Sequence, residues 1–173
     1  MGILRRGAFL FAVALAVVLP VRIWVAEPIV IASASMLPAL RVGDLMILDK
    51  WTLRSRAPRR GEIVSFRSPV ADLDMVKRVI AVPGDTVEIR HKEVYLDGRL
   101  QAEPYALHTR PGVRLQGDDL GPLTVPPDDY FVLGDNRDQS DDSSVWRDAS
   151  GARVYFVPRA ALQGLVRPLP WAS

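Results

Sequence analysis

Hydrophobic side chains are concentrated near the start of the chain, in a segment with almost no charge. Residues 7–25 contain one charged side chain, Arg22. A helix of that length, rising about 1.5 Å per residue, covers roughly 28 Å and so matches the hydrocarbon thickness of a bilayer. Arg5 and Arg6 precede the segment, and basic flanks favour the cytoplasmic side. The pattern predicts one transmembrane helix, a cytoplasmic N-terminus and an extracytoplasmic remainder.

After residue 28 the pattern changes to short apolar runs of strand length, many with β-branched residues, separated by Gly, Pro and Asp. Such runs favour strands over amphipathic helices. They comprise "PIVIAS" (28–33), "GDLMILDKW" (43–51), "GEIVSFRSP" (61–69), "DMVKRVIAV" (74–82), "TVEIRHKEVYLDGRLQ" (86–101), "YFVLGDNRD" (130–138) and "ARVYFVP" (152–158). The predicted fold class is all-β or mainly β.

Turn signals divide this β region further. Asp97-Gly98 is a strong two-residue hairpin signal. Residues 101–128 are rich in Pro, Gly and charge, which indicates a loop-like excursion, and residues 158–165 suggest a short helical turn. We therefore expect a cytoplasmic N-terminus and membrane anchor over 1–27, and an extracytoplasmic β domain over 28–173 with a small insert at about 96–128.

Composition excludes several kinds of chemistry. The chain has no cysteine, which excludes disulfides, thiol catalysis as in sortases, and cysteine metal sites. Lys and Arg number 22 against 20 Asp and Glu, and the basic residues are not interleaved with aromatics. Nucleic-acid binding is therefore not expected. The 14 prolines and 12 glycines are spread along the chain, as in a β domain with many turns.

The stretch "IASASMLPAL", residues 31–40, has two conflicting interpretations. Ala32-Ser33-Ala34 follows an apolar run and resembles the A-x-A site at which a signal peptide is cut. The same stretch places Ser35 in a setting typical of a catalytic nucleophile. Cleavage normally follows closely on the apolar segment, whereas Pro20 and Arg22 stand well before Ala32. An uncleaved anchor is therefore favoured.

A serine nucleophile needs a base to accept its proton. His91 and His108 have no companion motif and are expected to be surface residues. Lys77 lies among Met75, Val76, Val79 and Ile80, where burial would lower its pKa and leave it neutral. The alternative is a strand lysine that points to solvent.

The segment "GDNRDQSDDSSVW", residues 134–146, also has a simple interpretation as a polar turn after a buried strand. Its acids suggest calcium, but it lacks the glycine and terminal glutamate of an EF-hand loop. Ser35 also lacks the penicillin-binding Ser-x-x-Lys arrangement, because Pro38 occupies the lysine position.

Taken together and in this order, four segments resemble type I signal peptidase, the membrane-bound Ser-Lys endopeptidase. The segments are "RIWVAEPIVIASASMLPAL", "GDLMILDKW", "RRGEIVSFRSP…LDMVKRVIAVPGD" and "GDNRDQSDDSSVW". The resemblance extends from the anchor to about Pro168. It implies a twisted antiparallel β-sheet fold, with a catalytic core over 28–173 and a small inserted second part. It implies removal of signal peptides from secreted preproteins after A-x-A sites, without a cofactor or metal, by a monomer in the plasma membrane.

The resemblance also assigns roles to individual residues. Ser35 would be the nucleophile and Lys77 the general base, with the backbone N–H of Ser35 and the hydroxyl of Ser33 as the oxyanion hole. The residues expected to orient the lysine and support the site are Ser140, Asp142 and Arg78. The residues expected to bind the substrate, which is held as an extended strand, are Ile29, Ile31, Met36, Leu40, Asp74, Met75 and Val76.

The chain departs from the family pattern at several positions. Ala32 and Ala34 replace a proline and a glycine beside the nucleophile, and Ala39 replaces a threonine. Ala34 is tolerated if its φ is negative. Ser144 replaces the arginine that pairs with the loop acid, so Asp142 needs another partner, for which Arg78 and Arg137 are candidates. Residues 147–153 form an insertion without an interpretation.

Three other functions stay open at this point. A peptidase dedicated to a conjugation or pilus system would cut a single partner. An SOS-repressor-type autoprotease would carry a DNA-binding domain ahead of the serine, where this chain has an apolar segment. A membrane-tethered peptide-binding domain would have no need of both Ser35 and Lys77.

Overall fold

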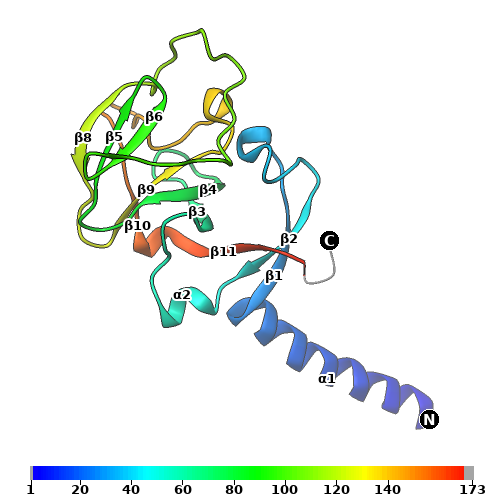
Figure 1. Ribbon diagram of the computed structural model, residues 1–173. Helices are drawn as coiled ribbons and strands as arrows, with labels where there is room; N and C mark the ends of the chain where they lie inside the picture. Colours follow the sequence, from blue (N-terminus) through cyan, green and yellow to red (C-terminus); the bar gives the residue numbers. More distant parts are fainter. Residues whose placement is uncertain (1, 170–173) are drawn as a thin grey trace.

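The computed structural model describes residues 2–169, and within them two antiparallel sheets lie against each other (Figure 1). The larger sheet has seven strands in the order β1-β2-β11-β3-β4-β9-β10. The smaller sheet has four, in the order β7-β6-β5-β8. The prediction of a mainly β protein is confirmed.

The strands follow the predicted apolar runs closely in the first half of the chain. The larger sheet consists of β1 (Ala26–Val30), β2 (Leu45–Asp49), β3 (Ile63–Arg67), β4 (Asp74–Ala81), β9 (Asp129–Leu133), β10 (Val157–Pro158) and β11 (Leu162–Pro168). The smaller sheet consists of β5 (Thr86–Arg90), β6 (Glu93–Leu96), β7 (Arg99–Leu100) and β8 (Leu120–Thr124). The helical segments are α1 (Gly2–Trp24), α2 (Thr52–Ser55) and the 3₁₀ turns η1 (Ala34–Met36), η2 (Arg137–Gln139) and η3 (Arg159–Ala161).

Two tight turns shape the smaller sheet. Asp97 and Gly98 have φ values of 51° and 76° and join β6 to β7, which confirms the predicted hairpin. His91 and Lys92 form a second left-handed turn, with φ values of 51° and 73°, between β5 and β6. Sequence analysis did not detect this turn because neither residue belongs to the Gly and Asn types that favour positive φ.

The C-terminal region differs from its prediction. Within the predicted helical turn over 158–165, Arg159–Ala161 forms η3, but Leu162–Pro168 is strand β11, which pairs with both β2 and β3. Backbone partners on both sides outweigh the weak local preference of this segment. Of the predicted strand over 152–158, only Val157–Pro158 pairs with β9 as β10, while Arg153 makes an isolated bridge to Arg147.

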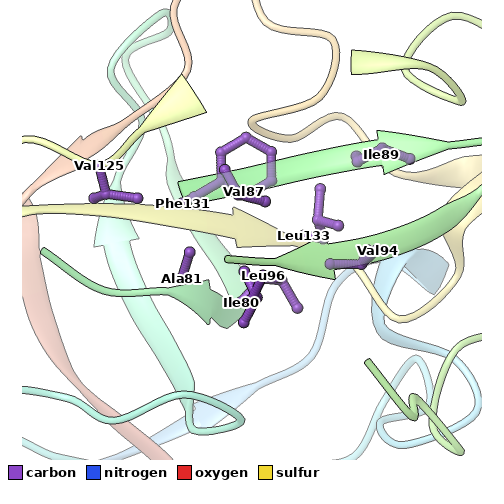
Figure 2. Close-up of a cluster of buried hydrophobic side chains, with 9 residues drawn as sticks. All are labelled: Ile80, Ala81, Val87, Ile89, Val94, Leu96, Val125, Phe131 and Leu133. Carbon is purple, nitrogen blue, oxygen red and sulfur yellow. The ribbon is translucent and has the colours of Figure 1, made fainter. Parts of the chain in front are cut away.

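Strand β9 lies between two hydrophobic clusters and is buried on both faces. Its alternate side chains Phe131 and Leu133 join the cluster between the two sheets, with residues of β4, β5 and β6 (Figure 2). Tyr130 and Val132 face the opposite cluster, which contains Trp146. This rigid strand ends at Leu133, where the polar 134–146 segment begins.

Helix α1 covers the segment for which a membrane span was predicted, and in Figure 1 it extends away from the sheets. No helix among the described residues, 2–169, has both the length and the hydropathy needed to cross a membrane. The predicted transmembrane helix is therefore not found in the structure.

Candidate active site

Ser35 and Lys77 lie in direct contact although 42 positions separate them in the chain. Lys77 Nζ donates a hydrogen bond of 2.8 Å to Ser35 Oγ. Ser35 belongs to η1, and Lys77 lies on β4 opposite Val64 of β3. Both residues are buried, with 8% and 3% of their surface exposed. A hydroxyl and an amine in this arrangement can exchange a proton.

Burial determines the acid–base character of Lys77. It lowers the pKa of the ammonium, because a low-dielectric environment disfavours the charged form. Asp142, Asp141 and Asp135 oppose this by raising the pKa of Lys77 through their negative charge. The net shift is downward, which increases the neutral fraction of Lys77 near neutral pH.

The backbone around Ser35 is held by the 134–146 segment. The N–H of Asn136 donates to the carbonyl of Ser35 at 3.0 Å, and Asn136 Nδ2 donates to the carbonyl of Ala34 at 3.2 Å. Ser33 Oγ lies 3.1 Å from Ser35 Oγ. Ala34 is not among the described residues with positive φ, so alanine fits this position without strain. Asn136 was not predicted as a site residue, although it belongs to the recognised loop.

Asp142 is fully enclosed and organises the same loop without an arginine. Its carboxylate accepts hydrogen bonds from the N–H of Gly134 at 3.0 Å and from the N–H and hydroxyl of Ser144 at 3.0 and 2.7 Å. Within residues 2–169 neither Arg78 nor Arg137 forms an ion pair with Asp142. Ser144 thus replaces the expected arginine with two neutral donors.

Ser140 lies beside Gly134, where a Cβ atom added to the glycine would collide with its side chain. Ser140 Oγ is buried and has no hydrogen-bond partner among the described residues. Within that part of the chain, the ammonium of Lys77 makes its one side-chain hydrogen bond to Ser35. The structure therefore places Ser140 close to the Ser35 backbone but shows no bond from it to Lys77.

Arg78 supports the loop through a different acid. Its guanidinium makes two bonds of 2.7 and 2.5 Å to Asp135, which is completely buried. The ring of Tyr105 covers the guanidinium at 4.0 Å. Arg78 also donates to the carbonyl of Gly61 at 2.7 Å. Arg78 therefore ties β4 to the start of the 134–146 segment.

The excursion after β7 is an ordered support for the loop. We call residues 101–110 the strap. Glu103 forms two bonds to Arg137, at 2.9 and 2.7 Å, and both side chains are less than one-tenth exposed. The N–H of Leu107 donates to the carbonyl of Asp135 at 2.7 Å, and the N–H of Arg137 donates back to Leu107 at 3.0 Å. Sequence analysis assigned the strap to a loop and gave no role to Glu103 or Tyr105.

Next to Ser35 and Lys77 is a largely apolar cleft of about 540 Å³. The predicted substrate-binding residues that line it are Ile29, Ile31, Met36, Asp74, Met75 and Val76. Leu40 does not line the cleft but packs beneath it, in the cluster that holds Ile31 and Met36. Asp141 also lines the cleft and was not predicted.

Within residues 2–169, two strand edges beside the cleft have backbone groups without a sheet neighbour. β1 is the first strand of the larger sheet and pairs with β2 alone. β9 pairs with β4 from Arg78 onward, so residues 74–77 pair on one side with β3 and have no strand on the other. An extended peptide can pair with such edges.

The two histidines lie outside the cleft. His91 is exposed in the β5–β6 turn. His108 is half-buried, with Nδ1 at 3.9 Å from Asp138, and burial together with Arg137 lowers its pKa. Neither residue contacts Ser35, whereas Lys77 Nζ lies 2.8 Å from Ser35 Oγ.

Known proteins resemble this chain over most of its length. Residues 4–171 match the family model described as signal peptidase, peptidase S26. The chain is 39% identical over 151 residues to a probable signal peptidase I-2 of Synechocystis, covering 83% of this chain and 62% of the relative. It is 35% identical over 169 residues to a signal peptidase I of Leptolyngbya laminosa, covering 93% of this chain and 76% of the relative.

A crystal structure of a signal peptidase I from Enterococcus faecalis superposes with a TM-score of 0.50 at 34% sequence identity, covering 64% of this chain and 97% of that one. The chain belongs to the signal peptidase family, peptidase S26, a family of hydrolases. The resemblance stated from the sequence is confirmed.

Proposed function

We propose that this protein removes signal peptides from secreted preproteins by acyl transfer on Ser35, with Lys77 as the general base. The observation that carries the proposal is the 2.8 Å contact between Lys77 Nζ and Ser35 Oγ, buried beside an apolar cleft. Membership of the signal peptidase family supports the substrate class.

The chemistry proceeds in two steps. Ser35 Oγ attacks the scissile carbonyl while Lys77 takes the hydroxyl proton, and the C–N bond breaks as Lys77 returns that proton to the leaving amine. Water then attacks the resulting ester, with Lys77 again as base, and releases Ser35. The Ser35 N–H and the Ser33 hydroxyl would stabilise the oxyanion, where loss of one donor typically costs about 2.7–4 kcal/mol.

Substrate selection follows from the cleft. A peptide extended between β1 and residues 74–77 would alternate its side chains toward and away from the apolar wall. Small side chains at two alternate positions fit a shallow wall that is formed by Ile29, Ile31 and Val76. The A-x-A preference is therefore part of the proposal.

Membrane attachment through α1 also belongs to the proposal. Phe9, Leu10 and Phe11 are each about two-thirds exposed, and such contiguous apolar surface typically marks an interaction site. An anchored enzyme meets emerging preproteins at a high effective concentration. Retention of the protein in membranes after alkaline carbonate extraction would support this part, and full release would contradict it.

The test is cleavage of an A-x-A preprotein by the purified full chain. We expect a cut after the second alanine by the wild type and no product with Ser35→Ala or Lys77→Met. Ser55→Ala, an exposed serine on α2, is the matched control and should cut normally. Activity surviving in either site variant would contradict the mechanism. A panel of unrelated preproteins separates a general peptidase from one that is dedicated to a single partner.

A further inference from the structure

A second cavity, of about 260 Å³, lies between α2 and the start of β11. Three basic side chains line it, Lys50, Arg54 and Arg159, and its lining includes no carboxylate. It is smaller than the pockets that enclose drug-sized ligands, so it suits a compact charged group. We call it the basic cavity.

Two of the three positive charges in the basic cavity are not neutralised. Lys50 Nζ is paired with Glu27 at 3.0 Å. Arg54 and Arg159 form no ion pair with any carboxylate among residues 2–169, and the one side-chain bond of Arg159 goes to the carbonyl of Leu53 at 3.2 Å. Arginine guanidinium groups bind phosphate in a bidentate geometry, so the cavity presents two phosphate-binding groups that no carboxylate of residues 2–169 occupies.

The basic cavity lies directly beside the C-terminal end of α1. The Arg54 guanidinium stacks on the ring of Trp24 at 4.5 Å, and Lys50 Nζ donates to the carbonyl of Arg22 at 3.3 Å. Trp24 is more than half exposed, and tryptophan favours the headgroup level of a membrane. Any lipid surface that contacts α1 would place headgroup phosphates next to the cavity.

We propose that the basic cavity binds the phosphate of an anionic phospholipid through Arg54 and Arg159. Leu53 and Leu162 supply an apolar wall for the glycerol part. This inference rests on the proposed membrane attachment of α1. The shared chemistry is a phosphate group, which a lipid headgroup or free inorganic phosphate can supply.

The basic cavity and the catalytic cleft share one side chain. Gln163 lines both, accepts a 2.8 Å bond from Ser65 and donates a 2.7 Å bond to Asp74, and those two partners also line the cleft. A lipid held here therefore fixes the orientation of the cleft relative to the bilayer.

The test counts lipids retained by the full chain in nonionic detergent micelles, using native mass spectrometry. Phosphatidylglycerol, whose phosphate has no internal cation, is compared with phosphatidylcholine. The double variant Arg54→Gln, Arg159→Gln is compared with the wild type. The matched control is the double variant Arg99→Gln, Arg114→Gln. It changes the net charge of the protein by the same amount, on exposed residues of the smaller sheet and its loop.

We expect the wild type and the control variant each to retain one phosphatidylglycerol molecule. The cavity variant should bind this lipid roughly tenfold more weakly, because it has lost the charge-assisted hydrogen bonds. Displacement by millimolar inorganic phosphate would identify the phosphate group alone as the ligand, and no displacement would identify the lipid. Equal retention of both lipids, or equal binding by the cavity and control variants, would overturn the proposal.

The same measurement on Ser35→Ala separates this inference from the peptidase mechanism, because that variant keeps the basic cavity intact. Flotation with neutral vesicles tests α1 independently. Single substitution Arg54→Gln provides a second variant if the double variant fails to fold, since Arg54 is exposed and lies on a short surface helix.

Discussion

Gly134 allows the loop and the nucleophile to approach each other. A Cβ atom there would lie 2.5 Å from the carbonyl oxygen of Ser35 and would collide with the Ser140 side chain. We expect Gly134→Ala to displace the Ser35 backbone and to lower kcat roughly 100-fold, the cost of a misplacement of about 1 Å. Preprotein cleavage measures the effect, and circular dichroism checks the fold. Gly121→Ala, with open space around it, is the control, and equal rates for the two variants would contradict the prediction.

Asp141 tunes Lys77 from the rim of the cleft. Its negative charge raises the pKa of Lys77, against the larger lowering by burial. In the proposed mechanism Lys77 acts as a base and must be neutral, so we expect activity to rise with pH through the pKa of this group. Asp141→Asn removes one opposing charge, lowers the pKa of Lys77 further, and should move the acid limb of the kcat/KM profile to lower pH.

The control for this variant is Asp72→Asn, whose carboxylate is almost fully exposed and pairs with Arg67 at the surface. Its profile should coincide with that of the wild type. A shift of the Asp141→Asn profile to higher pH, or no shift at all, would show that Asp141 does not act on Lys77 through its charge.

At the level of elements, the strap and the 134–146 loop form one unit. Glu103 is the buried partner of Arg137, and Glu103→Gln would leave that guanidinium buried without its counter-charge. We expect a loss of about 3 kcal/mol in the free energy of unfolding, the cost of breaking a buried ion pair. Urea unfolding measures this loss. We also expect kcat to fall, because the loop carries Asn136.

The matched control is Glu88→Gln, which removes the partner of Arg90 on an exposed part of β5. Exposed pairs contribute little, so its urea midpoint should stay at the wild-type value. If the two variants unfolded at the same urea concentration, the buried pair would not be a support of the loop.

The strap illustrates which parts of the site can be predicted from the sequence and which cannot. Ser35, Lys77 and the 134–146 loop were foreseeable because each lies in a segment with its own motif. Glu103 and Tyr105 were not, since their contacts join positions about 30 apart and leave no local periodicity. Strand β11 was missed for a similar reason, because its pairing with β2 and β3 is long-range. Strand β8 (Leu120–Thr124) was also missed, because it lies in the segment 101–128 that was predicted as a loop-like excursion and its pairing with β5 is long-range. The apolar runs predicted the other main strands.

At the scale of the whole molecule, the buried lysine costs stability. Its ordinary pKa of 10.5 applies to the unfolded chain, and the folded value is lower. Between these two values the unfolded state binds more protons, so the free energy of unfolding rises with pH across that window. Below the folded pKa the full penalty is present, and above about 10.5 it has vanished.

Lys77→Met removes this penalty while keeping the length of the side chain. We expect the variant to be inactive yet more stable than the wild type at pH 7, with a difference that shrinks toward pH 10. Urea unfolding at both pH values measures the free energy of unfolding of each protein. The other groups titrate in both proteins, so their contribution cancels when the two free energies are subtracted. A variant less stable at pH 7 would contradict the penalty.

The position of β11 sets the time at which the active pair can form. β1 and β2 flank Ser35, while β3 and β4 carry Lys77, and in the larger sheet these two pairs of strands are joined through β11 alone (Figure 1). Of these five strands, β11 is the last to be translated, and domains fold as units during synthesis. The nascent chain therefore contains both reactive residues long before it contains the strand that unites them. The order of translation thus keeps Ser35 and Lys77 on separate strand pairs until β11 has been made.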